Sequence, residues 1–330
     1  MHEAPAATRS LTAIAGGAIL PARWTVLASG SSGNASLLEL DGCGLLMDIG
    51  LGPRQFDRRL GAVGIGWESI RGAVLTHTHA DHWSGRSLAR LAELRIPFFC
   101  HPDHLRPLRL ACPEFQDLEL AGLVKTYASG AAFAPLAGIR CRALPLKHDG
   151  GPTFGFRIES DAQPGDPHWA IGYAADLGSW DDSLPHGLAE VDVLALEFNH
   201  DVERQLASGR ARWLINRVLG DFGHLSNAQG AKLLEECAGR SSPGRLRHVV
   251  QLHLSRDCNC PTLAEAAARD VISRLQLDVE LHTASQDVSC PTIHIADRPA
   301  EQGASPHDAG PVRARRALHP APAGINPAAR

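Results

Sequence analysis

The residues best able to do chemistry are three imidazoles and a carboxylate within six positions: His77, His79, Asp81 and His82. Neutral imidazoles and carboxylates are the ligands that divalent transition metals such as zinc prefer. A turn can bring together side chains that a straight strand would alternate, so His77 pairs with His79 and Asp81 with His82 in two diverging directions. Two diverging pairs predict two metal ions rather than one. A histidine-rich surface loop is the alternative, but chance seldom produces this spacing.

The cluster lies between a predicted strand at 71–75 and a predicted helix at 84–95, which has apolar residues at 88, 91, 92 and 94. Other apolar runs bounded by turn residues predict strands at 24–29, 36–40, 44–47, 96–100, 123–128, 139–146, 153–159, 169–174, 191–198 and 248–253. Helices are expected at 53–60, 101–110, 226–238 and from 261 onwards. The third of these helices begins with a capping box formed by Ser226 and Gln229. We expect His101 and His104 to lie on the surface.

Three further ligand candidates follow predicted strands, namely His148, Asp176 and His253. Each ion of a dinuclear site needs about three protein groups and a free position. We expect His148 to join His77 and His79 around the first ion, and His253 to join Asp81 and His82 around the second. Asp176 is the expected bridge, because a carboxylate has two oxygens. Taken singly, an aspartate like Asp176 is more often a turn residue, and a histidine like His253 is more often a core residue. The metal role is favoured here because the 77–82 cluster alone has too few ligands for two ions.

Other polar residues lie where they could support the metal site. Asp48 ends a strand and is expected to orient a histidine or its loop, with a helix cap or turn as the alternative. His224 precedes a helix and could contact a phosphate oxygen or protonate a leaving group, unless it packs beneath the helix cap. Asn199 and His200 could line the site or buttress it. Asp81 and His224 are the candidate catalytic residues.

Composition sets bounds on function. A chain of 330 residues with 44% apolar content can form one or two domains. Its net charge of −4 argues against a nucleic-acid binder that relies on overall charge, but not against a local basic groove. Such a groove could contain Arg204, Arg210, Arg212 and Arg217, although solvation of the surface explains them equally well. The eight cysteines have no Cys-x-x-Cys spacing and are expected to be free thiols in a reducing compartment.

The expected organisation is one domain between two disordered segments. Residues 1–22 are expected to form a disordered leader, because their apolar patch is weak and lacks the basic start of a secretory signal. A hydrolase domain is expected over 23–297, followed by a disordered tail rich in proline, alanine and arginine over 298–330. No run approaches the ~20 apolar residues that span a bilayer. We therefore expect a cytoplasmic protein with no membrane partner.

The ordered series of motifs resembles that of the metallo-β-lactamase fold superfamily over approximately residues 24–297. This resemblance implies an α/β fold, a four-layer αβ/βα sandwich in which two mixed β-sheets are flanked by helices. It also implies a dinuclear site at the sheet edge. In the resemblance Asp48 takes the place of the family's orienting aspartate, and the remaining positions match its ligands. These positions are His77, His79, Asp81, His82, His148, Asp176 and His253.

Several segments narrow the resemblance to one branch. True β-lactamases usually place a cysteine where Asp176 stands, and glyoxalase-type thioesterases have a Thr-Pro-Gly-His-Thr-like segment where this chain has Leu-Lys-His-Asp. Residues 28–34, 197–201, 223–227 and 253–255 look like the YycJ/WalJ branch, which is associated with nuclease activity on DNA. This likeness implies that Ser255, with Asn199 and His200, supports the site or contacts substrate. Cys258 and the 208–212 segment depart from the pattern of the branch.

The leading hypothesis is a dinuclear metal-dependent phosphodiesterase or exonuclease that uses a metal-bridging hydroxide on DNA, or on RNA. Anionic phosphodiester oxygens are attracted to a pair of cations, which can stabilise the attacking and leaving oxygens together. The ligand types fit both zinc and manganese. One alternative is a hydrolase of a small thioester, lactone or cyclic phosphodiester. Another is a metal-binding sensor without turnover. The sequence makes no prediction of oligomeric state.

Overall fold

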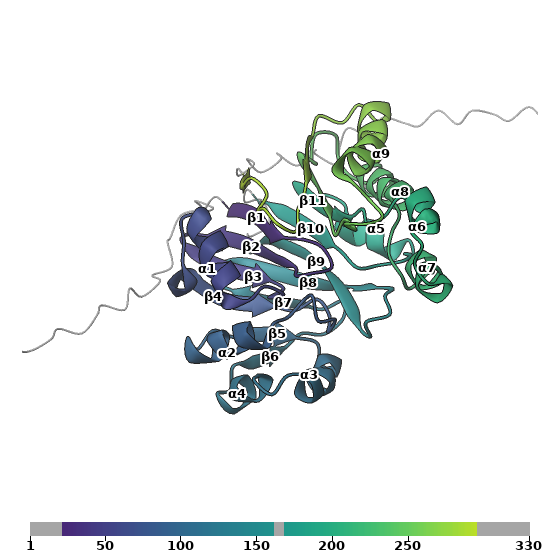
Figure 1. Ribbon diagram of the computed structural model, residues 1–330. Coiled ribbons are helices and arrows are strands. Elements are labelled where there is room, and N and C mark those ends of the chain that lie inside the picture. Colours follow the sequence, from purple (N-terminus) through teal and green to yellow (C-terminus); the bar gives the residue numbers. More distant parts are fainter. Residues whose placement is uncertain (1–21, 162–167, 296–330) are drawn as a thin grey trace, which may run out of the picture. The chain divides into compact units, whose positions relative to one another are not determined.

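Two mixed β-sheets form the centre of the computed structural model, which describes residues 22–161 and 168–295 (Figure 1). Within these residues each sheet has seven strands. The first sheet has the order β14-β1-β2-β3-β4-β5-β6. Its strands are β1 (Ala22–Ala28), β2 (Ala35–Leu40), β3 (Cys43–Met47), β4 (Ile70–Val74), β5 (Phe98–Cys100), β6 (Val124–Thr126) and β14 (Ile293–Ile295). Strands β3 to β6 run parallel, whereas β1 pairs antiparallel with both of its neighbours.

The second sheet has the order β13-β12-β11-β10-β9-β8-β7. Its strands are β7 (Ala132–Leu136), β8 (Ile139–Leu146), β9 (Thr153–Ser160), β10 (Ala170–Ala174), β11 (Val193–Glu197), β12 (His248–Leu252) and β13 (Glu280–Thr283). Strands β10 to β13 are parallel, and β9 is antiparallel to both β8 and β10. The carboxyl ends of β8, β10, β11 and β12 therefore lie at one edge of the sheet.

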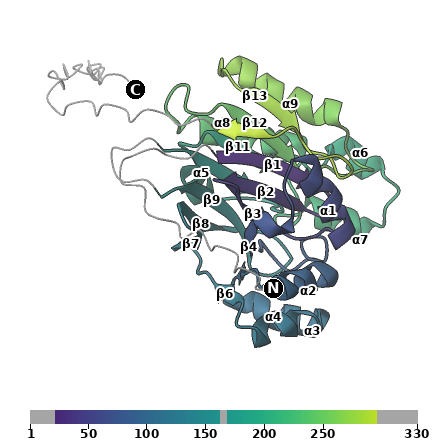
Figure 2. The ribbon, with the colours of Figure 1, turned by 90° about the vertical axis from the view of Figure 1, so that its left-hand side faces the viewer.

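Side-chain alternation divides the apolar residues into three layers. Leu38 of β2 and Val250 of β12 belong to the cluster between the sheets, whereas the neighbouring Leu37 and Val249 face helices. The first sheet is covered by α1 (Pro53–Ala62), α2 (Gly85–Glu93), α3 (Leu105–Ala111) and α4 (Phe115–Leu120). The second sheet is covered by α5 (Ser183–Leu188), α8 (Asn227–Ala238) and α9 (Pro261–Arg274). In Figure 1 the strands of the two sheets lie between α1 on the left and α5 and α8 on the right; Figure 2 is the view from that left side, in which the layers overlap.

Two short helices, α6 (Val202–Ala207) and α7 (Arg212–Leu219), follow β11, and 3₁₀ turns occur at Trp67–Ser69 and Pro102–His104. The order helix, sheet, sheet, helix confirms the predicted four-layer αβ/βα sandwich. The capping box at the start of α8 is also confirmed, because Ser226 and Gln229 bond reciprocally. All eight cysteines are free, as expected. No helix in the described parts of the chain is long and apolar enough to cross a membrane.

The structure differs from the sequence prediction in short elements and at one histidine. The pattern did not predict α4, α5, β7, β13 or β14, which span six residues or fewer and have weak periodicity. His104 is buried, not exposed as expected, because its Nε2 donates to the Pro152 carbonyl at 2.7 Å and its ring packs near Tyr127 and Phe154. The predicted leader and tail lie outside the described residues, except that Ala22 begins β1.

Candidate metal centre

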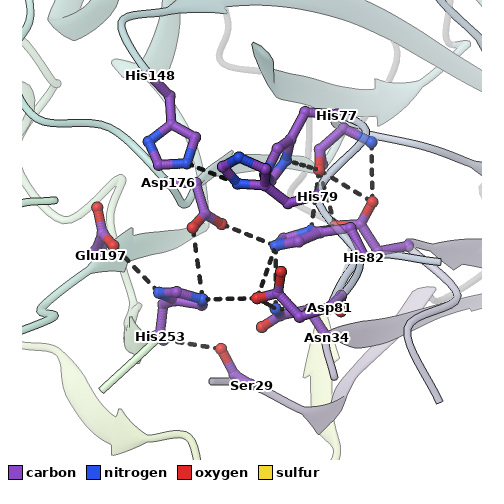
Figure 3. Close-up of polar contacts among 12 residues, drawn as sticks. Ser29, Asn34, His77, His79, Asp81, His82, His148, Asp176, Glu197 and His253 are labelled. Atoms are coloured by element: carbon purple, nitrogen blue, oxygen red, sulfur yellow. Dashed lines mark hydrogen bonds and ion pairs between the residues drawn. The ribbon is translucent and has the colours of Figure 1, made fainter. Parts of the chain in front are cut away.

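The predicted ligands converge from strand ends of both sheets (Figure 3). The first sheet contributes the loop that follows β4 and contains the histidine cluster. The second contributes His148 after β8, Asp176 after β10 and His253 after β12. Because the carboxyl ends of parallel strands meet at one edge, residues distant in sequence come together there.

The ligand atoms form two groups around a shared carboxylate. One contains His77, His79 and His148, and the other contains Asp81, His82 and His253; within each group the atoms lie within 4.8 Å of one another. Asp176 lies between them, with Oδ2 3.1 Å from His82 Nε2 and Oδ1 3.4 Å from His253 Nε2. This is the partition predicted from the sequence. The ligand role of each residue stays a prediction.

Hydrogen bonds on the outer side of three rings fix which nitrogen faces the centre. Nδ1 of His82 donates to Asp48 at 2.7 Å, Nδ1 of His148 donates to the Gly223 carbonyl at 2.9 Å, and Nδ1 of His77 lies 3.0 Å from Thr76 Oγ1. A proton held on Nδ1 leaves the Nε2 lone pair free for a metal.

One buried nitrogen shows that these residues fit a metal. Nε2 of His77 has no hydrogen-bond partner among the described residues. Buried polar atoms normally have a partner, and a cation would supply one here. The buried imidazole and carboxylate clusters are therefore consistent with a dinuclear site.

Asp48 contacts His82, the ring that it would orient in the role that the resemblance implied. Its carboxylate is fully buried and accepts from the Thr76 backbone N–H at 2.8 Å and from the Thr76 hydroxyl at 3.0 Å, as well as from His82. Burial raises the pKa of Asp48 even though His82 opposes the shift. Burial also acts to lower the pKa of His82, but Asp48 and Asp176 outweigh it and raise this pKa well above its usual value.

The charges of the centre compensate one another. Burial disfavours the ionised form of Asp176, yet His253 and His82 hold its pKa well below the ordinary value. Burial likewise opposes ionisation of Asp81, but His253 and His82 lower its pKa to about 2. His77 has a pKa well below its usual value because it is buried and lies near the positive His82. The carboxylates of Asp81 and Asp176 and the rings of His82 and His253 thus stabilise one another's charges.

Three residues of the centre adopt the left-handed backbone conformation. The φ angles are 59° at Asp48, 63° at Asp176 and 56° at His253. This conformation costs a residue with a Cβ roughly 1–2 kcal/mol. All three positions lie one or two residues beyond a strand. Such backbone strain gathers at functional sites, where the surrounding structure maintains it.

Two residues that contact the ligands were not predicted. Glu197 ends β11 and is fully buried; its Oε1 lies 2.7 Å from His224 Nδ1 and 3.3 Å from His253 Nδ1. Burial opposes its ionisation, but His224 lowers the pKa of Glu197 to about 2. Asn34 Nδ2 lies 3.2 Å from Asp81 Oδ2. A carboxylate that ends a wholly apolar strand was the available signal for Glu197.

The other predicted site residues differ in their position relative to the metal centre. His224 faces the centre, with Nδ1 3.6 Å from Asp176 Oδ1 and its ring stacked on His253. Asn199 lies behind His253, and its Nδ2 donates to the His253 carbonyl at 2.8 Å.

His200 and Ser255 are buried as supports of the loops and are not brought among the ligand atoms. Burial lowers the pKa of His200 to about 4, and its carbonyl accepts from the Asn227 N–H at 2.8 Å. The Ser255 N–H donates to the Asn199 carbonyl at 2.8 Å, and its hydroxyl accepts from the Cys258 N–H at 3.2 Å.

An αβ/βα sandwich with paired imidazole and carboxylate clusters at one sheet edge defines a metal-dependent hydrolase of the metallo-β-lactamase fold. The sequence pattern of the beta-lactamase superfamily domain matches residues 45–245, so the chain belongs to this superfamily. It is 27% identical to the exodeoxyribonuclease WalJ of Streptococcus pneumoniae over 284 residues, which cover 83% of this chain and 98% of that protein.

Two further proteins are similar. The exodeoxyribonuclease YycJ of Bacillus anthracis is 26% identical over 255 residues, 76% of this chain and 88% of that protein. The crystal structure of the metallo-beta-lactamase fold protein YhfI from Bacillus subtilis has a TM-score of 0.57 at 17% identity, and the match covers 82% of this chain and 99% of that chain. The structural likeness supports the fold alone.

Replacing Asp48 by Asn is expected to weaken zinc binding roughly 10- to 100-fold, the usual effect of losing a residue that orients a metal-bound histidine. An amide has one acceptor oxygen, so it cannot accept from both the Thr76 N–H and the His82 Nδ1, as the two carboxylate oxygens of Asp48 do, and Nδ1 of His82 is no longer held as the protonated nitrogen. A competition titration with a chromophoric chelator measures the affinity. Asp41→Asn is the matched control, because Asp41 also has a positive φ, of 48°, but is exposed. Equal affinities in both variants would contradict the orienting role.

Glu197→Gln is expected to destabilise the metal-free protein by on the order of 3 kcal/mol near pH 5.5, given a pKa lowered from 4.5 to about 2 in the folded state. A lowered carboxyl pKa contributes stability above about pH 4.5, and this contribution is lost as the pH falls towards 2. The difference in unfolding free energy between the wild type and the variant should therefore shrink below pH 4.5. Urea unfolding in EDTA measures it, with the exposed Glu203→Gln as control. A difference that stays constant down to pH 3 would count against the ion pairs of Glu197.

Proposed function

We propose that the chain is an exodeoxyribonuclease that hydrolyses phosphodiester bonds at a dinuclear metal centre. The observation that carries the proposal is the similarity to the exodeoxyribonuclease WalJ over 98% of that protein's length. When bound, two divalent ions supply a hydroxide nucleophile near neutral pH and neutralise charge on the phosphoryl group. Zinc and manganese both suit the imidazole and carboxylate ligands.

His224 is the proposed proton donor to the leaving oxygen. Its Nδ1 is engaged by the Glu197 carboxylate at 2.7 Å, and that carboxylate is itself held by the N–H groups of Leu177 at 3.0 Å and Leu225 at 3.2 Å. A carboxylate on Nδ1 fixes the orientation of the ring, and a positioned imidazole is the side chain that most often serves as a general acid. The His224 side chain is 15% exposed, so its ring is accessible from the rim of the site.

The surface beside His224 fits a single nucleic-acid strand. Trp213 on α7 is 69% exposed and Phe222 in the following loop is 58% exposed. The Phe222 carbonyl accepts from the N–H of Asp149 at 3.0 Å, and Asp149 follows His148 directly, so this loop borders the centre. Exposed aromatic rings near arginines provide stacking surfaces for unpaired bases.

The four arginines that could form a basic edge differ in how far other residues of the chain already bind them. Arg217 binds Asp149 at the rim of the centre, and Arg210 lies 2.7 Å from Asp257. Arg204 donates to the Asn259 carbonyl at 3.2 Å, while Arg212 beside Trp213 is exposed. The proposed path of the strand therefore relies on Arg212 and the aromatic rings more than on a continuous basic groove.

Metal-stripped enzyme supplied with zinc or manganese is expected to shorten end-labelled DNA stepwise, with the products resolved on a denaturing gel. His79→Ala and Asp81→Ala should abolish this activity, because each removes a proposed ligand and Asp81 is also a proposed catalytic residue. The exposed His186→Ala on α5 serves as the control for loss of a histidine. If the loaded enzyme leaves DNA and RNA intact while hydrolysing a thioester or lactone, the nuclease proposal is wrong and the small-molecule alternative holds.

His224→Gln is expected to lower kcat for DNA by roughly 10²- to 10⁴-fold, the usual contribution of a general acid. The bound metal, measured by elemental analysis, should stay at the wild-type amount, since His224 is not a proposed ligand. Loss of one equivalent of metal from the variant would instead make His224 a ligand. His186→Gln should leave both quantities unchanged.

Trp213→Ala is expected to raise KM for single-stranded DNA about 5- to 100-fold at unchanged kcat, because one stacked base contributes about 1–3 kcal/mol. Leu120→Ala on α4 removes an apolar side chain that is also largely exposed, from a helix on the other sheet, and should leave KM unchanged. Steady-state kinetics on an unstructured oligonucleotide measures both constants. Equal KM values for the two variants would remove α7 from the proposed path.

A further inference from the structure

A second group of metal-binding side chains lies on the second sheet, away from the candidate metal centre. His248 begins β12, Glu280 begins the neighbouring β13, and His282 lies two residues further along β13. In the parallel register His248 is opposite Glu280, and Val250 is opposite His282. Side chains two apart on a strand share a face, so all three lie on the face of Val250, which belongs to the core between the sheets.

The three side chains converge on a common point. His248 Nδ1 and His282 Nε2 are 3.3 Å apart. The carboxylate oxygens of Glu280 lie 3.6 Å from His248 Nδ1 and 3.8 Å from His282 Nε2. A zinc ion held tetrahedrally at about 2.0–2.1 Å from two imidazole nitrogens keeps those nitrogens roughly 3.3 Å apart. The side chains therefore already have the spacing of a metal-binding triad.

The environment favours neutral imidazoles, which are the metal-binding form. Burial is the main cause that lowers the pKa of His248 and of His282, and in both cases it outweighs the attraction of Glu280. Of the other groups near His248, His282 and Arg247 lower its pKa further and Asp192 opposes the shift. A neutral imidazole forms only a weak ion pair with a carboxylate, so a salt bridge explains the cluster poorly.

We propose that His248, Glu280 and His282 form a third metal site, separate from the candidate metal centre, for a divalent transition-metal ion such as zinc. His248 and His253 flank β12 at opposite ends, five residues or roughly 16 Å apart. Two imidazoles and one carboxylate suit zinc, copper or nickel better than magnesium or calcium. Three protein ligands leave positions open for water or for a small ligand.

The site joins β13, the edge strand of its sheet within the described residues, to β12. An edge strand is held by one neighbour only, and β13 pairs with β12 over four residues. An ion bound to His248 on one strand and to Glu280 and His282 on the other stabilises this pairing. Metal binding at this position therefore strengthens the sheet edge without touching the reacting groups.

Metal stoichiometry of the full chain tests the proposal. Zinc-saturated wild type, dialysed and measured by elemental analysis, should hold one equivalent more than the double variant His248→Ala/His282→Ala, whose circular dichroism is checked for the native fold. Activity on DNA should be the same in both proteins, which separates this site from the catalytic one. Equal zinc content in two folded proteins would overturn the proposal, whatever the outcome of the nuclease assays.

A single exposed variant keeps the proposal testable if the double variant does not fold. The side chain of Glu280 is 67% exposed, so Glu280→Ala should fold normally, while zinc at the third site binds at least 10-fold more weakly. Glu93→Ala, 63% exposed on α2, is the matched control. Hydrogen exchange should show zinc-dependent protection of the β13 amides in the wild type and the control but not in Glu280→Ala. Identical zinc affinity and protection in all three proteins would also overturn the proposal.

Discussion

The structure depends on the burial of carboxylates directly against imidazoles where the two sheets meet. A buried charge is costly unless an opposite charge or hydrogen-bond donors compensate it. Asp48 has His82 and Thr76, Asp176 has His82 and His253, and Glu197 has His224 with two backbone N–H groups. Removal of one member leaves its partner charged and unpaired, so the strand ends that present these groups are coupled.

Much of the fold and the arrangement of the ligands could be predicted from the sequence, because both depend on local regularities. The spacing His-x-His-x-Asp-His is read directly, and apolar runs that stop at His148, Asp176 and His253 mark strand ends. What the sequence did not predict depends on packing between distant segments. The contacts of Glu197 with His224 and His253 bring together residues from three separate segments of the chain, which the sequence alone does not show. Ser255 likewise bonds to the loops around it and does not lie among the proposed ligand atoms. Short strands such as β14 have too few residues for a periodic pattern.

The two sheets contribute unequal parts of the centre. The loop after β4 supplies four of the seven proposed ligands, all within six positions of the chain. The other three proposed ligands follow three separate strands of the second sheet, and Asp176 and His253 have left-handed backbone at those strand ends. The strain at these positions is maintained by packing of the whole sheet, which links the precision of the centre to an intact core.

The pairing of β1 with β14 has a consequence for how the chain is made. Ala22 pairs with Ile295 and Trp24 with Ile293. In the described structure, the strand partner on this side of β1 therefore comes from residues more than 260 positions later in the chain. A nascent chain that emerges from the ribosome therefore exposes this strand edge for most of its synthesis, a state in which chaperones protect against misassociation. Because β1 and β14 are adjacent, the protein is also suited to circular permutation, with these two strands joined by a linker and new ends opened in a surface loop.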